Sequence, residues 1–237
     1  GGFSCSGGGA APAPAFGAAN RAKFELKDLS LSKVEDVEPI TRALAGQAME
    51  TVVLEGAPVD QDETPAVGGQ AAQALADALR SCKGSLRRLT MMNHRFDSDQ
   101  SMSTVLKSLS ECTALEELDL TNSSLGSAGG TVLASVLRSC PTLKALRVED
   151  CGLEDEGCLP VAQALSALPA LEDVDLRNND MEAESVLALA ASVGGKDKLV
   201  AIRLDDDDNL PYEKIRNALL AMGKAETLKL GDDEDGW

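Results

Sequence analysis

The chain has 237 residues, of which 43% are hydrophobic and 3% aromatic, values that suit one folded unit with an aliphatic core. Lys and Arg number 22 against 39 Asp and Glu, so the formal net charge is −17, which argues against nucleic acid or an anionic membrane surface as a partner. No run approaches the roughly 20 apolar residues that a membrane-spanning helix needs, so no direct membrane insertion is expected.

The first 23 residues are rich in Gly, Ala, Pro and Ser and contain no acidic residue. Such a composition cannot bury enough apolar surface to fold alone, so we expect residues 1–23 to be a flexible or processed segment. A start of this kind that ends in basic residues is also typical of an organelle import signal. An import remnant, which would place the protein inside an organelle such as the chloroplast, and a plain flexible tail both stay open.

From residue 24 onward the chain repeats one pattern, L-x-x-L-x-L. Copies begin at residues 49, 86, 115, 143, 171, 199 and 225, and a degenerate copy, LKDLSLSKV, begins at Leu26. A spacing near 28 residues is typical of leucine-rich repeats, whose units each supply one strand that stacks on its neighbours. We expect parallel strands centred on the fourth position of each copy, at Leu29, Val52, Leu89, Leu118, Leu146, Val174, Ile202 and Leu228.

Between the strands, apolar residues recur at i, i+4 and i+7, the spacing of one helix face. The sets are Leu75, Leu79, Cys82; Val105, Leu109, Cys112; Leu133, Leu137, Cys140; Val161, Leu165, Leu168; and Ile215, Leu219, Met222. One unit differs, because Lys196 takes the third place after Leu189 and Val193. Residues 24–237 are therefore predicted to form a right-handed α/β solenoid with a parallel inner sheet of about eight strands, outer helices and a short acidic C-terminus.

Three of the six cysteines, Cys82, Cys112 and Cys140, share one place in the repeat, which leucine or methionine fills elsewhere. A place that accepts leucine is a packing position, so we expect reduced, buried thiols there. No C-x-x-C pair occurs, so no zinc site is expected. Unpaired core thiols suit a reducing intracellular compartment, either the cytoplasm and nucleus or an organelle interior.

The sequence offers no catalytic constellation. His94 is the only histidine, and it occupies the ninth place of its repeat, where a side chain that hydrogen-bonds the turning backbone is expected. A pair of histidine ligands is thereby excluded, and a Ser/His/Asp device would depend on this residue alone. No G-x-x-x-x-G-K-[ST] phosphate loop occurs. We expect no catalytic residue, no metal and no cofactor.

Charged residues recur at matching places of successive strands. The fifth positions carry Asp119, Arg147, Asp175 and Arg203, which a parallel ladder would hold about 4.8 Å apart. Alternating signs at that spacing predict cross-strand ion pairs, each contributing about 0.2–1 kcal/mol. We therefore expect the exposed face of the sheet to be largely self-paired.

The unbalanced acidic residues lie in the loops that follow the strands. Because such loops share one edge of a parallel solenoid, we expect them to form a continuous acidic rim that binds a basic protein surface. Its candidate residues are Glu154, Asp155, Glu156, Asp180, Asp205, Asp206, Asp207 and Asp208. Simple solubility is the alternative for these charges. The run of aspartates lacks the glycine and spaced ligands of a calcium loop, so no metal is expected.

The phrases LEELDLTNSSLGSAGG and SC-x-x-L resemble the ribonuclease-inhibitor-like class of leucine-rich repeats. The order FELKDLSL, VEDVEPITRAL, a longer second repeat and an acidic end most resembles a Ran GTPase-activating protein. That resemblance spans residues 24–235 and implies an arginine after an early repeat, for which Arg95 is the nearest match. It also implies an asparagine in L-x-N-N-G-L-G; the expected repeat has Asp150 and Cys151 there, and the nearest asparagine is Asn179.

Two functions of different class follow. The first is a non-catalytic protein–protein interaction module, a subunit or scaffold within a larger multi-subunit assembly. The second is a GTPase-activating protein for a Ran-like small GTPase. The departures at Asp150 and Cys151 favour the first function.

Overall fold

The computed structural model describes residues 22–57 and 66–231. One eight-stranded parallel sheet runs through them in sequence order, from β1 (Lys23–Leu29) through β2 (Thr51–Gly56), β3 (Arg88–Met92), β4 (Glu117–Asp119), β5 (Ala145–Arg147), β6 (Asp173–Asp175) and β7 (Ala201–Leu204) to β8 (Leu228–Leu230). The helices are α1 (Val34–Leu44), α2 (Gly69–Ser81), α3 (Asp99–Ser108), α4 (Gly126–Leu137), α5 (Glu154–Ala164), α6 (Ala183–Val193) and α7 (Tyr212–Leu220).

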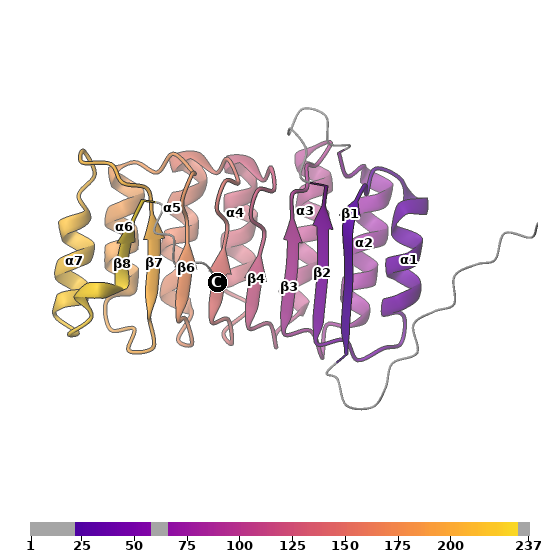
Figure 1. Ribbon diagram of the computed structural model, residues 1–237, viewed down its shortest axis with the longest axis horizontal. Helices are drawn as coiled ribbons and strands as arrows, with labels where there is room; N and C mark the ends of the chain where they lie inside the picture. The colour runs from indigo at the N-terminus through magenta and orange to yellow at the C-terminus, as the bar shows by residue number, and fades with distance from the viewer. Residues whose placement is uncertain (1–21, 58–65, 232–237) are drawn as a thin grey trace, which may run out of the picture.

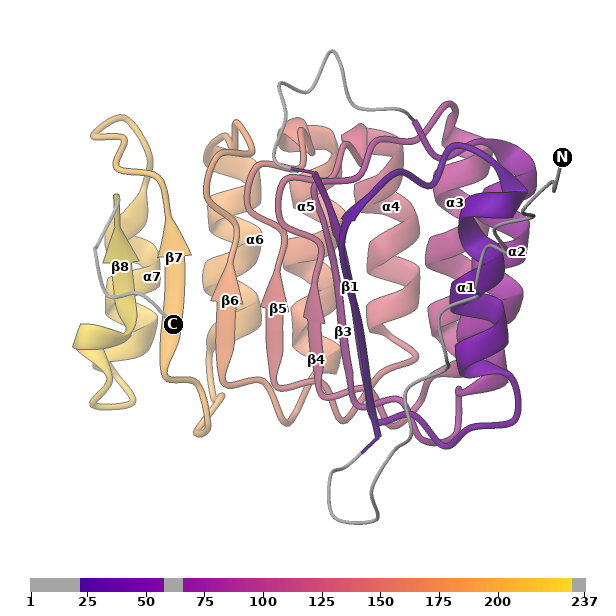
Figure 2. The same cartoon turned by 45° about the vertical axis from the view of Figure 1, so that its right-hand side comes forward.

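Strands and helices form two layers, with the helices behind the sheet and every strand pointing the same way (Figures 1 and 2). Short 3-10 turns extend two of the helices, at Leu109–Glu111 and Leu165–Ala167, and a third turn, Ala225–Thr227, precedes β8. The predicted solenoid with an inner parallel sheet and outer helices is confirmed. Residues 1–21 of the predicted N-terminal segment and the acidic C-terminus from residue 232 lie outside the described residues.

The strands keep one register along the sheet. The fourth positions of the repeats are paired neighbours in it: Val52, Leu89, Leu118, Leu146, Val174, Ile202 and Leu228. Nearly all of these side chains are buried between the sheet and the helices. A repeat can bury its strand only against the neighbouring units, so this shared register is what creates the core.

The first strand departs from the prediction. Phe24, and not Leu29, pairs with Val52, so the register expected for this strand was wrong by five residues. The sequence offered leucines at 26, 29 and 31, but the chain pairs through the alternation that turns Phe24 and Leu26 toward the core. The register then shifts between Leu26 and Leu29, where Asp28 adopts a left-handed backbone with φ of 54°.

The helical layer follows the predicted spacing. Every member of the predicted triplets is buried except Met222, which packs half-buried against the core. Lys196 also enters its slot, where it is buried and its ammonium donates a 2.8 Å hydrogen bond to the Leu168 carbonyl. Burial lowers the pKa of Lys196. This bond replaces the weak thiol contact that Cys140 makes with the Cys112 carbonyl at 3.9 Å.

Helices α4 and α5 approach each other at backbone distance. A methyl group added to Gly130 would lie 2.5 Å from both the Cα and the carbonyl oxygen of Gly157, and one on Gly157 would lie 2.9 Å from the Cα of Ser127. Only glycine fits such a contact. The two helices therefore form one closely packed surface on the outside of the solenoid.

Within residues 22–57 and 66–231, no helix is both long enough and apolar enough to cross a bilayer.

Candidate functional site

The charges of the exposed sheet face are paired, as predicted. Asp119, Arg147, Asp175 and Arg203 occupy one row of the register. Inside this row, the Arg147 guanidinium lies 3.9 Å from Asp119. The Arg203 guanidinium lies 2.6 Å from Asp173, which is two residues before Asp175 on β6. Lys144 contacts Glu116 at 2.7 Å, and this hydrogen bond is the main reason that the pKa of Glu116 is lowered.

Asp175 lies at the centre of this face with its side chain only 2% exposed. Arg177 donates through Nε at 3.0 Å and through Nη2 at 2.7 Å to its carboxylate, and also contacts Glu149 at 3.2 Å. Arg203, for which the sequence predicted Asp175 as partner, contacts the neighbouring Asp173 at 2.6 Å. Burial nevertheless raises the pKa of Asp173. The sheet face is thus an ion-pair network with its charges already engaged.

The ninth residues of four successive repeats form an interior hydrogen-bond ladder. Each bonds a backbone carbonyl of the preceding repeat: His94 Nε2 to Leu54 at 3.2 Å, Ser123 Oγ to Met91 at 2.9 Å, Cys151 Sγ to Leu120 at 3.1 Å and Asn179 Nδ2 to Val148 at 2.6 Å. The structural role predicted for the ninth place is therefore confirmed for His94. Burial lowers the pKa of His94 to about 4, so its imidazole is neutral at pH 7.

The two residues implied by the resemblance to a Ran GTPase-activating protein are not brought together. Asn179 is fully buried, and its carboxamide accepts hydrogen bonds from the backbone of Cys151 and Leu153 at 3.1 and 3.2 Å. Arg95 follows β3 and is half-buried, with its carbonyl accepting from Val67 at 2.7 Å. Three strand spacings, about 14 Å, separate β3 from β6.

The eight candidate residues of the acidic rim lie in the loops and helix starts that follow β5, β6 and β7. Asp155 accepts a 2.8 Å hydrogen bond from the Glu182 amide, and Asp205 accepts one of 2.9 Å from the Asn178 amide, so each loop contacts the next. Five of the candidate residues are exposed: Glu154, Glu156, Asp180, Asp206 and Asp208. Within the described part of the chain, none of the eight rim carboxylates forms an ion pair.

Part of this acidity serves the helices, which the sequence reasoning missed. The rim is also the edge where the helices begin, and Glu154, Asp155 and Glu156 form the first turn of α5. Carboxylates there complement the positive end of the helix dipole by about 0.3–1 kcal/mol each at exposed positions. The available signal was the position of each acidic run just before an apolar helical pattern.

The cysteines contribute to packing. Cys82, Cys112, Cys140, Cys151 and Cys158 are free and buried, which confirms the predicted burial of the first three. Burial raises the pKa of Cys112 to about 12 and that of Cys140 to about 11, so neither supplies a reactive thiolate at pH 7. Among the described residues, no group of His, Cys, Asp and Glu side chains could hold a metal ion.

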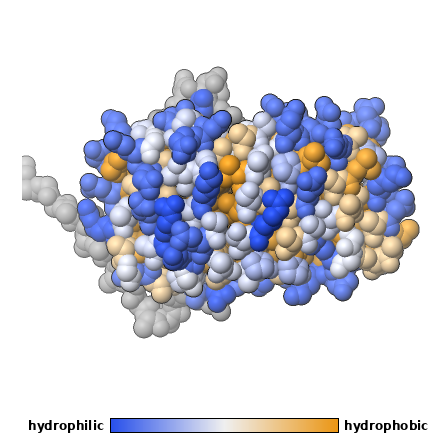
Figure 3. All heavy atoms as spheres, turned by 180° about the vertical axis from the view of Figure 1, so that it is seen from behind, coloured by the Kyte–Doolittle hydropathy of each residue, from blue (hydrophilic) through white to orange (hydrophobic). Residues whose placement is uncertain are grey.

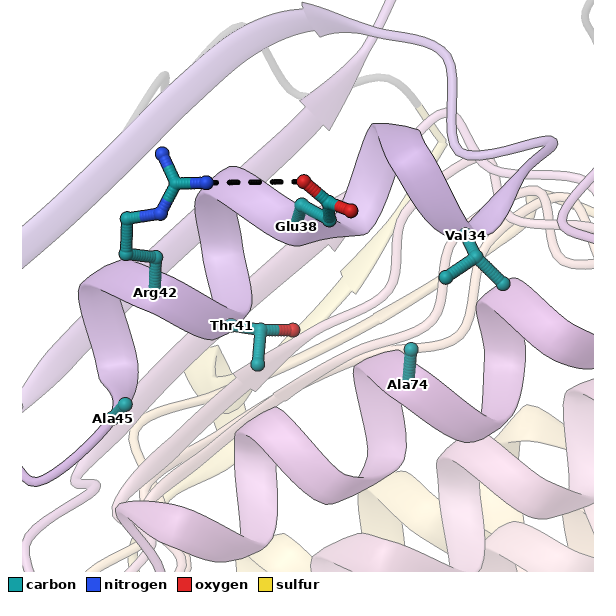
Figure 4. A pocket seen from close by; sticks show the side chains of 6 residues that line it. All are labelled: Val34, Glu38, Thr41, Arg42, Ala45 and Ala74. Carbon is teal, nitrogen blue, oxygen red and sulfur yellow. Dashed lines mark ion pairs between the residues drawn. The ribbon is translucent and has the colours of Figure 1, made fainter.

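The hollows of the surface are shallow. One of about 390 Å³ lies between α1 and α2, with Val34, Thr41 and Ala74 on its walls and the Glu38–Arg42 ion pair of 3.8 Å at its side (Figure 4). Another of about 190 Å³ lies beside Asp206, Asp208 and Tyr212 at the C-terminal end of the rim. Neither joins a nucleophile to a general base.

Comparison with known proteins agrees with this geometry. A family model of the leucine-rich repeat matches residues 111–134 and 139–162. In these two stretches the chain is similar to leucine-rich repeats. No curated protein matches its sequence.

Two solved structures share the fold. The domain titled leiomodin-1 actin-binding site 2 matches with a TM-score of 0.54 at 13% identity, over 64% of this chain and 89% of that one. The C-terminal domain of tropomodulin from Caenorhabditis elegans matches with a TM-score of 0.53 at 13% identity, over 64% and 93%. At such identities the likeness is one of fold alone, and the likeness to Ran GTPase-activating proteins stays a sequence-based expectation.

Proposed function

We propose that this protein is a non-catalytic interaction module, a subunit or scaffold of a larger assembly, whose acidic rim binds a basic surface of a protein partner. The rim consists of Glu154–Glu156, Asp180 and Asp205–Asp208. Repeat proteins of this kind present long continuous surfaces, and such surfaces suit binding more than chemistry. In leiomodin-1, a domain of similar fold is an actin-binding site.

The segregation of charge carries the proposal. On the sheet face, acidic and basic side chains satisfy one another, as in the Arg177–Asp175 and Arg203–Asp173 pairs. On the rim, the carboxylates share one edge and bond backbone amides or face solvent. An unpaired field of one sign steers a partner of opposite charge, and salt weakens it because the Debye length falls from about 10 Å at 0.1 M to about 3 Å at 1 M.

GTPase activation is not favoured by the geometry. The resemblance implies that Asn179 contacts the GTPase, yet its carboxamide is buried. The side-chain amide group donates to the carbonyls of Val148, Leu176 and Arg177. Turning it outward would leave those carbonyls without this donor. The interaction module needs no such rearrangement.

The test uses the partner that co-purifies with the native protein, produced separately once identified. Replacing Asp205–Asp208 by asparagine should slow association and flatten its dependence on salt, measured by stopped-flow or surface plasmon resonance. The matched control replaces Asp119 and Arg147 together by alanine and should change association much less. Loss of binding in that control, with full binding by the asparagine variant, would move the site to the sheet face.

A further inference from the structure

Beyond their first turns, three adjacent helices of the outer layer, α4, α5 and α6, carry no charged residue. Segments 120–137, 157–171 and 185–195 contain no Asp, Glu, Lys or Arg, although 26% of the chain is charged. The other helices differ: α1 carries Glu38 and Arg42, α2 carries Asp77 and Arg80, α3 carries Asp99 and Lys107, and α7 carries Lys214 and Arg216. Beyond the first turn, the absence of charge is therefore a property of α4, α5 and α6 and not of the helical layer as a whole.

The structure places these helices side by side. Gly130 and Gly157 bring α4 and α5 into backbone contact, and Ser185 on α6 bonds the Asp155 carbonyl of α5 at 3.2 Å. The exposed or half-exposed residues of this surface, here called the neutral helix face, are Ala128, Thr131, Val132 and Ser135; Leu159, Pro160 and Gln163; and Leu187, Ala188 and Ala191. Leu187 is 46% exposed.

The borders of the neutral helix face are charged and differ in sign. Exposed carboxylates of Glu154, Glu156, Glu182 and Glu184 stand at the N-terminal ends of α5 and α6. Arg138 caps α4 at the opposite end. In the view onto the helices, the half away from the N-terminus has a blue upper edge, and the surface below it is mainly pale and orange with blue patches between (Figure 3).

We propose that the neutral helix face docks a helix of a protein partner whose contacting stripe is small and apolar and whose basic residues meet Glu154, Glu156, Glu182 and Glu184. The inference rests on the proposed function and extends it, because these glutamates adjoin or belong to the acidic rim. Small side chains such as Ala188 and Ala191 let another helix approach closely, and Leu159 and Leu187 supply the ridges that fill its grooves. Charge complementarity at the glutamate border sets its direction.

A second copy of this chain is the competing occupant, and the charge argues against it. Each copy carries a net charge of −17, so two copies repel at long range, whereas a basic partner is attracted. Burying one leucine side chain contributes about 1.5–3 kcal/mol, so removing two such contacts should cost at least about tenfold in affinity.

The test uses the full chain and three fluorescent synthetic peptides of about 18 residues: a helix with an Ala/Leu stripe and lysines at one end, the same residues with the stripe scrambled, and the stripe without lysines. Fluorescence anisotropy should show the first peptide binding about tenfold or more tighter than either other. The variant Thr131→Lys, Leu159→Lys, Leu187→Lys should lose that preference. Gln163→Lys replaces Leu159→Lys if the melting temperature shows that the triple variant is unfolded.

The matched control puts the same three charges elsewhere, as Gln70→Lys, Gln73→Lys and Gln100→Lys on exposed positions of α2 and α3. Equal weakening by both triple variants, or no preference for the striped peptide, would overturn the proposal. Sedimentation equilibrium showing a dimer that the first triple variant abolishes would assign the face to a second copy and also overturn it. Rim-dependent binding of the native partner that survives the first triple variant would overturn the helix face alone and leave the proposed function standing.

Discussion

The buried histidine predicts a loss of stability in mild acid. His94 is 3% exposed, and its Nε2 lies 3.2 Å from the Leu54 carbonyl. A carbonyl oxygen only accepts, so Nε2 must carry the hydrogen, and protonation would have to occur on the second ring nitrogen inside the core. Burial therefore lowers the pKa of His94 from 6.5 to about 4. The unfolded chain binds this proton more readily than the folded one.

The sign and size follow from linkage. Stability from the neutral imidazole is fully present above the unfolded pKa of 6.5 and is lost as the pH falls toward the folded pKa of about 4. At 1.36 kcal/mol per pKa unit, the two values give a loss of about 2 kcal/mol at pH 5 and about 3 kcal/mol at pH 4. Against a typical stability of 5–15 kcal/mol, such a loss is easily measured.

The assay compares the wild type with His94→Asn in urea at several pH values between 7.5 and 4. Asparagine fits the ninth place, as Asn179 shows, and does not titrate. The carboxylates titrate in both proteins, so the difference between the two free energies of unfolding isolates the histidine. Between pH 7.5 and pH 5 the free energy of unfolding of the wild type should fall by about 2 kcal/mol more than that of His94→Asn. Parallel loss of stability in both proteins would refute the burial argument.

Other substitutions test packing and catalysis. Cys112→Ser should lower the free energy of unfolding in urea by about 1–3 kcal/mol, because the nearest acceptor of the Cys112 thiol, the Ser108 carbonyl, is 4.0 Å away. Gly130→Ala should cost about 1–3 kcal/mol through backbone clash and lower the melting temperature, whereas Gly84→Ala, which meets open space, should not; equal effects would contradict the close contact. We expect no stimulation of Ran GTP hydrolysis; a rise of about 10³-fold or more that Arg95→Ala abolishes would make GTPase activation the function.

The repeat spacing predicted the solenoid because each unit has an apolar strand face and an apolar helix face that must be buried against the neighbouring units. The spacing gave wrong predictions for a strand with a neighbour on one side only and for a side chain with an unusual hydrogen-bond partner. Phe24 lies in an edge strand, so pairing on one side alone selects its register, and the degenerate leucines around Leu29 misled the alignment. Lys196 entered a leucine slot because the Leu168 carbonyl lies within reach of its ammonium, which no linear pattern reveals.

Of the candidate surfaces, one could be predicted from the sequence and the other needed the structure. Acidic runs after the strands predicted one edge, because parallel strands bring their ends together. The neutral helix face was visible only as three uncharged segments, and it became a surface once Gly130 and Gly157 showed that α4 and α5 touch. Helix-dipole complementarity at Glu154–Glu156 likewise needed the helix start to be known.

The separation of charged rim and uncharged face has a kinetic consequence. Long-range attraction acts before contact, so substitutions at Asp205–Asp208 should change the association rate and its dependence on salt. Apolar burial acts only after contact, so substitutions at Leu159 and Leu187 should change the dissociation rate and leave association nearly unaltered. One partner that shows both behaviours would place the rim and the helix face in a single interface. A partner whose association depends on the rim but whose dissociation is unchanged by these leucine substitutions would restrict its interface to the rim.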